Sequence, residues 1–169
     1  MTDIAEVIDE SIKLELNVSK LYTLFHEIFP DHGDFWWTLS IEEKNHASLL
    51  LTGKNHFGSI GMVPKKLLAT RLEMLEMTNY ELQFLIDKFT HTPPSEEDAF
   101  DLAIQIEESA GEIHFQNFMQ NNSDNPLEEI FHKLNSDDAN HAERIRSYKE
   151  KYVKNYKNGT FTSSIESAA

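Results

Sequence analysis

The chain has 169 residues, a net charge of −14 and no cysteine. Without cysteine, disulfides, zinc ribbons and iron–sulfur clusters are excluded, and the acidic balance argues against nucleic acid or an anionic membrane surface as a partner. The sequence MTDIAEVIDE at the amino terminus has no apolar run, and no stretch reaches the ~18–20 apolar residues of a membrane span. We therefore expect a cytoplasmic protein of one domain.

Apolar residues recur at helical spacing along most of the chain, and Pro and Gly interrupt them. The first helix ends at FPDHGD (29–34), and a second helix is expected from about Asp34 to His56. A third follows the loop FGSIGMVP, over about 65–90. Ser95, which precedes three acidic residues, is typical of a helix start and opens a fourth helix that extends to about 120. Pro126 suits the first turn of a fifth, which continues to about Tyr156.

No segment alternates with a period of two, so the sequence predicts an all-α protein. We expect one domain over 1–157, made of two helical hairpins at about 2–56 and 95–157. The third helix lies in the long crossover between them, at 57–94. Residues 158–169 are expected to form a short carboxy-terminal extension.

The two hairpins resemble each other in sequence. SIKLELNVSKLY (11–22) aligns with AIQIEESAGEIH (103–114), which pairs Glu15 with Glu107. EEKNHA (42–47) aligns with DDANHA (137–142), which pairs two acid-x-x-His motifs. Each hairpin therefore carries one acid on its first helix and one acid-x-x-His motif on its second. Helix lengths place the paired residues at one height of an antiparallel hairpin, within about one turn.

This pattern predicts a dinuclear metal site. Residues at i and i+3 are neighbours on a helix, so each motif can offer an oxygen and an imidazole nitrogen to one ion. Buried carboxylates without cations would be very costly, and two divalent ions neutralise them. Carboxylate and imidazole ligands suit iron or manganese. The expected metal ligands are Glu15, Glu43, His46, Glu107, Asp138 and His141.

Several other residues are candidates beside this set. Glu129 and His132 repeat the spacing, but they have no partner in the first hairpin and lie half a turn out of phase with His141. Tyr22 shares the face of Glu15 and is either a phenol donating to a ligand or a core residue, and His114 is its repeat mate. Solvated helix face is the favoured interpretation for acids beside the ligands: Glu42, Glu108, Glu112 and Asp137. Packing is expected for Trp36, Trp37, Met74, Met77 and Met119.

The motifs IKLELNVSKLY, EEKNHA, IQIEESAGEIH and DDANHA resemble the rubrerythrin branch of the ferritin-like superfamily, over roughly residues 5–55 and 98–155. The resemblance implies an antiparallel four-helix bundle with two iron ions, in which Glu43 and Asp138 bridge the metals while Glu15 and Glu107 cap them. The chain departs from rubrerythrins in having no Cys-rich rubredoxin domain, in Ala110 where they carry an extra Glu, and in the shorter Asp138.

Three functions remain open at this point. The first is an oxidoreductase that reduces peroxide or dioxygen with electrons from an external donor protein, in a protein expected to form a homodimer. The second is a ferroxidase or iron-handling protein that oxidises Fe(II), which an acidic surface would help attract. The third is a structural or regulatory module that binds metal without turnover.

Overall fold

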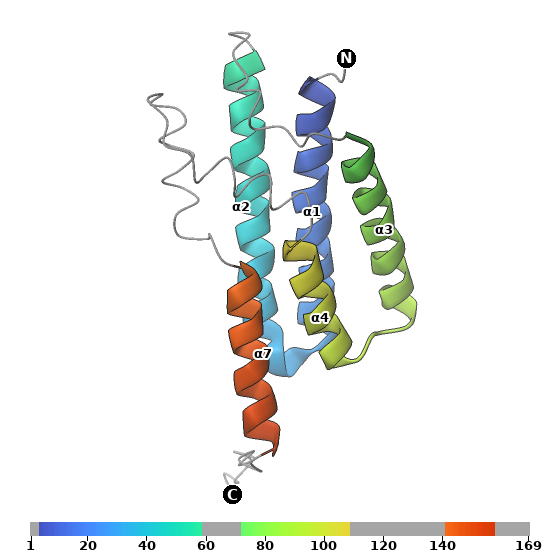
Figure 1. Cartoon of the computed structure of the whole chain (residues 1–169), viewed down its shortest axis with the longest axis vertical. Helices are drawn as coiled ribbons and strands as arrows, with labels where there is room; N and C mark the ends of the chain where they lie inside the picture. Colours follow the sequence, from blue (N-terminus) through green and yellow to red (C-terminus); the bar gives the residue numbers. More distant parts are fainter. Residues whose placement is uncertain (1–3, 59–71, 109–140, 158–169) are drawn as a thin grey trace, which may run out of the picture.

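The computed structural model describes residues 4–58, 72–108 and 141–157, and all regular structure in these ranges is helical (Figure 1). No strand occurs in them, which confirms the all-α prediction. No described helix is long and apolar enough to cross a membrane. The helices are α1 (Ile4–Ile28), the short 3₁₀ helix η1 (Pro30–His32), α2 (Gly33–Gly58), α3 (Leu72–His91), α4 (Glu96–Glu107) and α7 (His141–Lys157).

The helix boundaries agree with the sequence wherever both can be compared. The break between the first two helices falls at Phe29–His32, and Ser95 caps α4 as expected: its Oγ accepts a hydrogen bond from the Asp98 amide at 3.1 Å. This bond satisfies one of the orphan amides of the first turn. The expected continuation of the fourth helix to about 120, the start of the fifth at Pro126 and the tail 158–169 lie outside the described residues.

The turn between α1 and α2 is tight and built from backbone bonds. The amides of Phe29 and His32 donate to the carbonyls of Phe25 and Phe29 at 2.9 and 3.0 Å, and Pro30 occupies the first position of η1. A side chain at Gly33 would meet His26 Nδ1 at 3.2 Å, and that ring lies against the Gly33 carbonyl at 2.9 Å. The turn returns α2 antiparallel to α1, so the two helices lie side by side (Figure 1).

One hydrophobic core joins all five longer helices. Its largest members are aromatic and have no exposed surface: Trp36, Tyr22 and Phe25. Phe25 meets Trp36 edge to face at a centroid distance of 5.1 Å. Each such ring stabilises the fold by roughly 1.5–3 kcal/mol through burial alone. The core therefore fixes α4 and α7 against the hairpin of α1 and α2.

The crossover helix α3 is fixed on α1 by a buried amide pair as well as by apolar contacts. Asn79 is 1 % exposed, and its Oδ1 accepts a hydrogen bond from Asn17 Nδ2 at 3.0 Å. Its Nδ2 donates to the Glu10 carbonyl at 2.9 Å and to Glu10 Oε2 at 2.8 Å. Buried amides are costly unless they are paired, so one register of α3 on α1 is favoured over its neighbours.

Replacing Asn79 with Leu is expected to destabilise the metal-free protein by about 1–3 kcal/mol, because Asn17 is left buried without its acceptor. Urea unfolding followed by circular dichroism measures the change. The double variant Asn17→Leu/Asn79→Leu should recover part of the loss, since no lone amide then remains. Gln83→Leu, at an exposed position of the same helix, is the control. An Asn79→Leu protein as stable as this control would contradict the role assigned to the pair.

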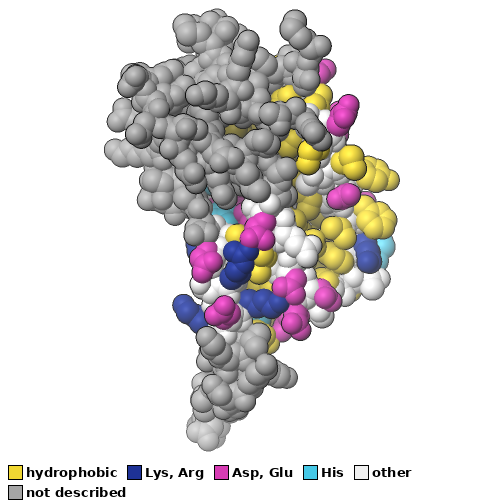
Figure 2. All heavy atoms as spheres, viewed as in Figure 1, with side chains coloured by type: hydrophobic (Ala, Val, Ile, Leu, Met, Phe, Trp, Pro, Cys, Tyr) yellow, Lys and Arg dark blue, Asp and Glu magenta, His cyan; other side chains and the backbone are white. Residues whose placement is uncertain are grey.

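Several apolar residues expected in the interior are exposed. Met74 and Met77 are expected to pack in the core or in the crossover. They lie on the crossover helix α3 and are 43 % and 64 % exposed, so core packing is wrong for both. The two tryptophans also differ, because Trp36 has no exposed surface and Trp37 is 44 % exposed. Figure 2 shows hydrophobic side chains gathered on the side where α3 lies, and Lys and Arg side chains over α7.

Candidate metal centre

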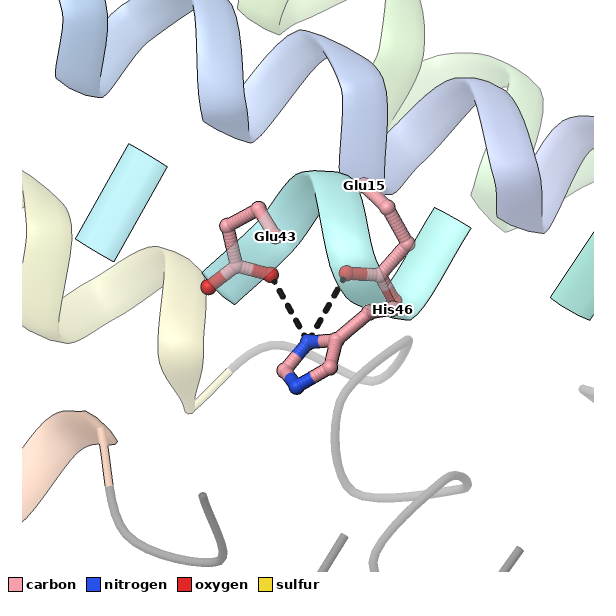
Figure 3. A group of neighbouring side chains, drawn as sticks. All are labelled: Glu15, Glu43 and His46. Atoms are coloured by element: carbon pink, nitrogen blue, oxygen red, sulfur yellow. Dashed lines mark hydrogen bonds and ion pairs between the residues drawn. The ribbon is translucent and has the colours of Figure 1, made fainter. Parts of the chain in front are cut away.

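Glu15, Glu43 and His46 meet between α1 and α2 (Figure 3). Glu15 comes from the middle of α1, while Glu43 and His46 lie one turn apart on α2. The His46 Nδ1 atom is 3.0 Å from Glu43 Oε2 and 3.5 Å from Glu15 Oε2. One ligand atom from each of the three lies within 4.8 Å of the other two. The spacing i, i+3 thus brings an acid and an imidazole together, as the sequence predicts.

A second group combines Glu43 with Glu107 of α4 and His141 of α7. The His141 Nδ1 atom is 2.7 Å from Glu43 Oε1 and 3.5 Å from Glu107 Oε2. Glu43 therefore turns one carboxylate oxygen toward each histidine. The two imidazole rings are stacked, with centroids 5.4 Å apart and planes inclined by 18°. Both groups share Glu43, so they form one cluster with two halves.

All five residues of the cluster are buried, at 1–6 % exposure. Burial raises the pKa of Glu15 to about 8, against the lowering effect of its hydrogen bond with His46. Burial also raises the pKa of Glu107 above its ordinary value, although contact with His141 opposes it. Without a cation beside them, these two carboxyl groups therefore ionise less readily than ordinary glutamates.

The other three members, His46, His141 and Glu43, are charged because the histidines and the carboxylates lie in contact. Burial would lower the pKa of His46, but hydrogen bonds to Glu15 and Glu43 outweigh it and raise the pKa to about 11. His141 behaves in the same way: burial is outweighed by its contacts with Glu107, Glu42 and Glu43, and its pKa is raised. Burial likewise opposes ionisation of Glu43, but the two histidines hold its pKa well below its ordinary value. Without metal, protons supply the positive charge of this cluster.

Two residues outside the cluster orient its members. The Tyr22 hydroxyl donates to Glu107 Oε1 at 2.5 Å, so this phenol lies on a candidate ligand. Glu42 Oε2 lies 3.3 Å from His141 Nε2, and Arg144 holds the same carboxylate through two hydrogen bonds of 2.8 and 3.1 Å. Burial would raise the pKa of Glu42, but contacts with His141 and Arg144 hold it below its ordinary value. The prediction that Glu42 belongs to the solvated face is wrong.

The structure brings together five of the six predicted ligands, and the sixth, Asp138, lies outside the described residues. So do Glu112, His114, Glu129, His132, Asp137 and Met119. Glu108 is exposed and pairs with Arg146, as expected for a surface acid. The sequence does not predict the contact of Glu42 with His141, because the helical period places Glu42 away from the interface between α1 and α2. It faces α7 instead, and Arg144, three residues after His141, was the available signal.

The donor set fits a pair of divalent cations. The Glu15 Oε2 and Glu43 Oε1 atoms are fully buried and receive no well-aligned hydrogen bond from the described residues. Buried oxygens of this kind need either protons or cations. Carboxylate oxygens with one imidazole nitrogen in each half suit iron or manganese. The Nε2 atom of His141 lies beside Glu42, and a carboxylate beside the outer nitrogen is common where a histidine binds metal.

Comparison with models of protein families, with curated proteins and with solved structures found no match.

Proposed function

We propose that this chain is a dinuclear metal protein of the ferritin-like kind, and that it is an oxidoreductase resembling rubrerythrins. The observation that carries the proposal is Glu43, whose two oxygens face two different histidines within a buried cluster. The internal repeat supports it, because each hairpin contributes one lone glutamate and one histidine to the cluster. In the proposed bundle, α1, α2, α4 and α7 supply one ligand-bearing segment each.

In this proposal each metal ion is held by one half of the cluster. Glu15 and His46 would hold one ion, Glu107 and His141 would hold the other, and Glu43, which belongs to both groups, would contribute to both. Asp138, three residues before His141 in the sequence, is the sixth proposed ligand, and the resemblance to rubrerythrins implies that it would be shared by both ions. Two iron ions are the proposed cofactor, with manganese as the alternative, and bound iron would supply one-electron redox chemistry toward peroxide or dioxygen.

The chain's own residues supply the surroundings of this chemistry. Tyr22 holds Glu107 by its hydroxyl, and Glu42 with Arg144 holds the outer nitrogen of His141. The low exposure of all five ligands keeps bulk water away from the cluster, where electrostatic interactions are then stronger than in water. Fixed ligands and limited water favour a small oxidant over a large substrate.

Iron-loaded protein is expected to bind about two ions per chain and to consume hydrogen peroxide in the presence of a one-electron reductant. The matched control is the His46→Ala/His141→Ala protein, in which metal content and peroxide consumption should both fall strongly. Oxidation of excess Fe(II) in air, measured on the same samples, separates the two redox functions.

Faster Fe(II) oxidation than peroxide consumption would favour the ferroxidase. Two bound ions with no turnover of either substrate would favour a structural or regulatory module. Wild-type metal content in the double variant would reject the site.

A further inference from the structure

We infer that Tyr22, Trp36, Phe35 and Tyr148 form an electron-transfer path from the metal cluster to a surface pocket between α2 and α7. The inference rests on the proposed function, which requires an external electron donor and a route inward. The inference names the route, the entry point on the surface and the residues that are transiently oxidised during the transfer. The contacts that carry it are ring contacts through the core and one hydrogen bond at each end.

The inner half of the path begins at the cluster. The Tyr22 hydroxyl donates to Glu107, and the ring of Tyr22 lies 5.6 Å from the ring of Trp36, centroid to centroid. Neither side chain has exposed surface. Tyr and Trp are the side chains that lose one electron most readily among the aromatic residues, and electrons tunnel efficiently between rings in van der Waals contact. A charge on Tyr22 can thus pass to Trp36 without crossing water.

The outer half leads from Trp36 to the surface. The Phe35 ring lies 5.3 Å from Trp36, and it is stacked on Tyr148 with centroids 3.9 Å apart and an angle of 12°. Phe100 makes a parallel connection, at 4.8 Å from Trp36 and 5.9 Å from Tyr148. Phe35 and Tyr148 both line a surface pocket of about 360 Å³, together with Glu143, Arg144, Ser147 and Lys151. The path therefore ends where a donor in solution can reach it.

The charge of this surface differs from that of the rest of the chain. Helix α7 carries six of the 15 Lys and Arg residues and only two of the 29 acids. Figure 2 shows Lys and Arg side chains over α7, with Asp and Glu side chains beside them. Three of these cations pair with acids on α2 and on or next to α4, in the pairs Arg144–Glu42, Arg146–Glu108 and Lys149–Asp101. This side is therefore closer to charge balance than the rest of an acidic chain, and a one-electron carrier with an acidic surface meets less repulsion here.

Both tyrosines have a partner that can take the phenolic proton, which oxidation of a neutral phenol releases. At the inner end the Tyr22 hydroxyl donates its proton in a hydrogen bond to Glu107 Oε1. At the outer end the Tyr148 hydroxyl lies 3.2 Å from Nδ1 of His32, a histidine that is 3 % exposed and enclosed by aromatic rings. Burial and the charge of Asp34 raise the pKa of Tyr148, which keeps its phenol neutral at rest.

Trp36 differs from the tyrosines in having no such partner. Its buried Nε1–H has no hydrogen-bond acceptor among the described residues. An oxidised indole therefore keeps its proton and returns to its resting state when one electron arrives. Such a residue is suited to passing electrons on, since no proton has to be recovered.

Electrons and protons balance in the following way. The external carrier is oxidised by one electron for each transfer, and that electron would reduce the metal ions that the proposed function places in the cluster. Tyr22 gives up one electron while its proton stays within the hydrogen bond to Glu107 Oε1, and it regains the electron from Trp36. Oxidised Trp36 is reduced by an electron that comes from Tyr148 through Phe35. The phenolic proton of Tyr148 moves to His32 and returns when the carrier donates an electron to Tyr148. No residue is changed after one passage.

The test uses metal-free protein, so its result is independent of the proposed cofactor. The chain has no cysteine and two tryptophans, so Ser147→Cys in a Trp37→Phe background gives one labelling position in the pocket and leaves Trp36 as the sole indole. A ruthenium polypyridyl label is attached there and converted to a one-electron oxidant by a laser flash with a sacrificial quencher. We expect transient absorption to show a Trp36 radical, followed by a tyrosyl radical that Tyr22→Phe removes.

Variants along the path decide the outcome. Tyr148→Leu should slow formation of the Trp36 radical at least tenfold, and so should Phe35→Leu/Phe100→Leu, which removes both connections between Trp36 and Tyr148. His32→Gln should lower the yield of oxidised Tyr148. Phe89→Leu is the matched control, because Phe89 is a buried ring of the same core that lies away from the pocket, on α3. Circular dichroism confirms that each variant is folded. Absence of a Trp36 radical, or equal rates in Tyr148→Leu, Phe35→Leu/Phe100→Leu and Phe89→Leu, would overturn the inference. Failure of metal binding alone would instead reject the proposed function.

Discussion

Glu43→Gln is expected to remove most of the metal from both halves of the cluster, although it changes a single atom. The side chain faces His46 with one oxygen and His141 with the other, so a neutral amide weakens both halves together. Glu15→Gln changes only the half of the cluster that contains His46. The protein should then lose about half as much metal as the Glu43→Gln protein, because the half that contains His141 is unchanged. Metal analysis after exhaustive dialysis measures both variants against the wild type.

The control for this experiment is Glu76→Gln, which makes the same substitution at an exposed position of α3. It should retain the wild-type metal content. The amide introduced by Glu43→Gln has the shape of the native carboxylate, so circular dichroism should show an unchanged helix content. If Glu43→Gln and Glu15→Gln lose the same fraction of metal, Glu43 is not shared between two ions.

The second large effect is on stability: metal-free protein is expected to become less stable as the pH rises from about 5 to about 9, by several kcal/mol. Glu15 has its pKa raised to about 8, so the folded state keeps a proton that the unfolded state loses near 4.5. Stability therefore falls with pH between these two values. His46, raised to about 11, contributes stability that is complete below 6.5 and is lost as the pH rises toward 11.

Glu43 acts in the opposite pH range. Its pKa is held below the ordinary value of 4.5, so its contribution is present above 4.5 and is lost as the pH falls through the lower value. The metal-free protein should thus be most stable at about pH 5–6. Metal ions replace the protons of the cluster, so metal binding strengthens as the pH rises. The difference in Tm between metal-bound and metal-free protein should widen from about pH 6 to about pH 9.

Differential scanning calorimetry at several pH values, with and without chelator, measures this difference. The Glu15→Gln variant removes one of the titrating groups and should flatten the pH dependence of the metal-free protein, whereas Glu76→Gln should leave it unchanged. A metal-free protein equally stable at pH 6 and pH 9 would contradict the buried, proton-bearing cluster described above.

The sequence predicts the parts of the fold and site that depend on local spacing. Helical periodicity gives the helices, Ser95 gives the start of α4, and the spacing of Glu43 and His46 places them on one face of α2. The repeat adds the long-range information, because it equates Glu15 with Glu107 and His46 with His141. Local rules alone would not connect residues so far apart.

Other features depend on which helix faces which, and spacing does not supply that. Glu42 points away from α1, but it points toward α7, so its contact with His141 requires knowledge of the fourth helix. Met77 has the hydrophobicity of a core residue, yet Asn79 lies inside because Asn17 and Glu10 provide partners for its amide. Trp36 and Trp37 are adjacent, and only their direction on α2 separates a buried ring from an exposed one.

The order of the cluster's residues along the chain has a consequence for folding during synthesis. The group of Glu15, Glu43 and His46 lies entirely within α1 and α2, and closing it needs a loop of about thirty residues, whereas His141 meets Glu43 across 98 residues. A growing chain completes the first group long before the second exists. If the first ion binds at that stage, it holds Glu43 in place as a template, and α4 and α7 then dock onto a hairpin that is already ordered.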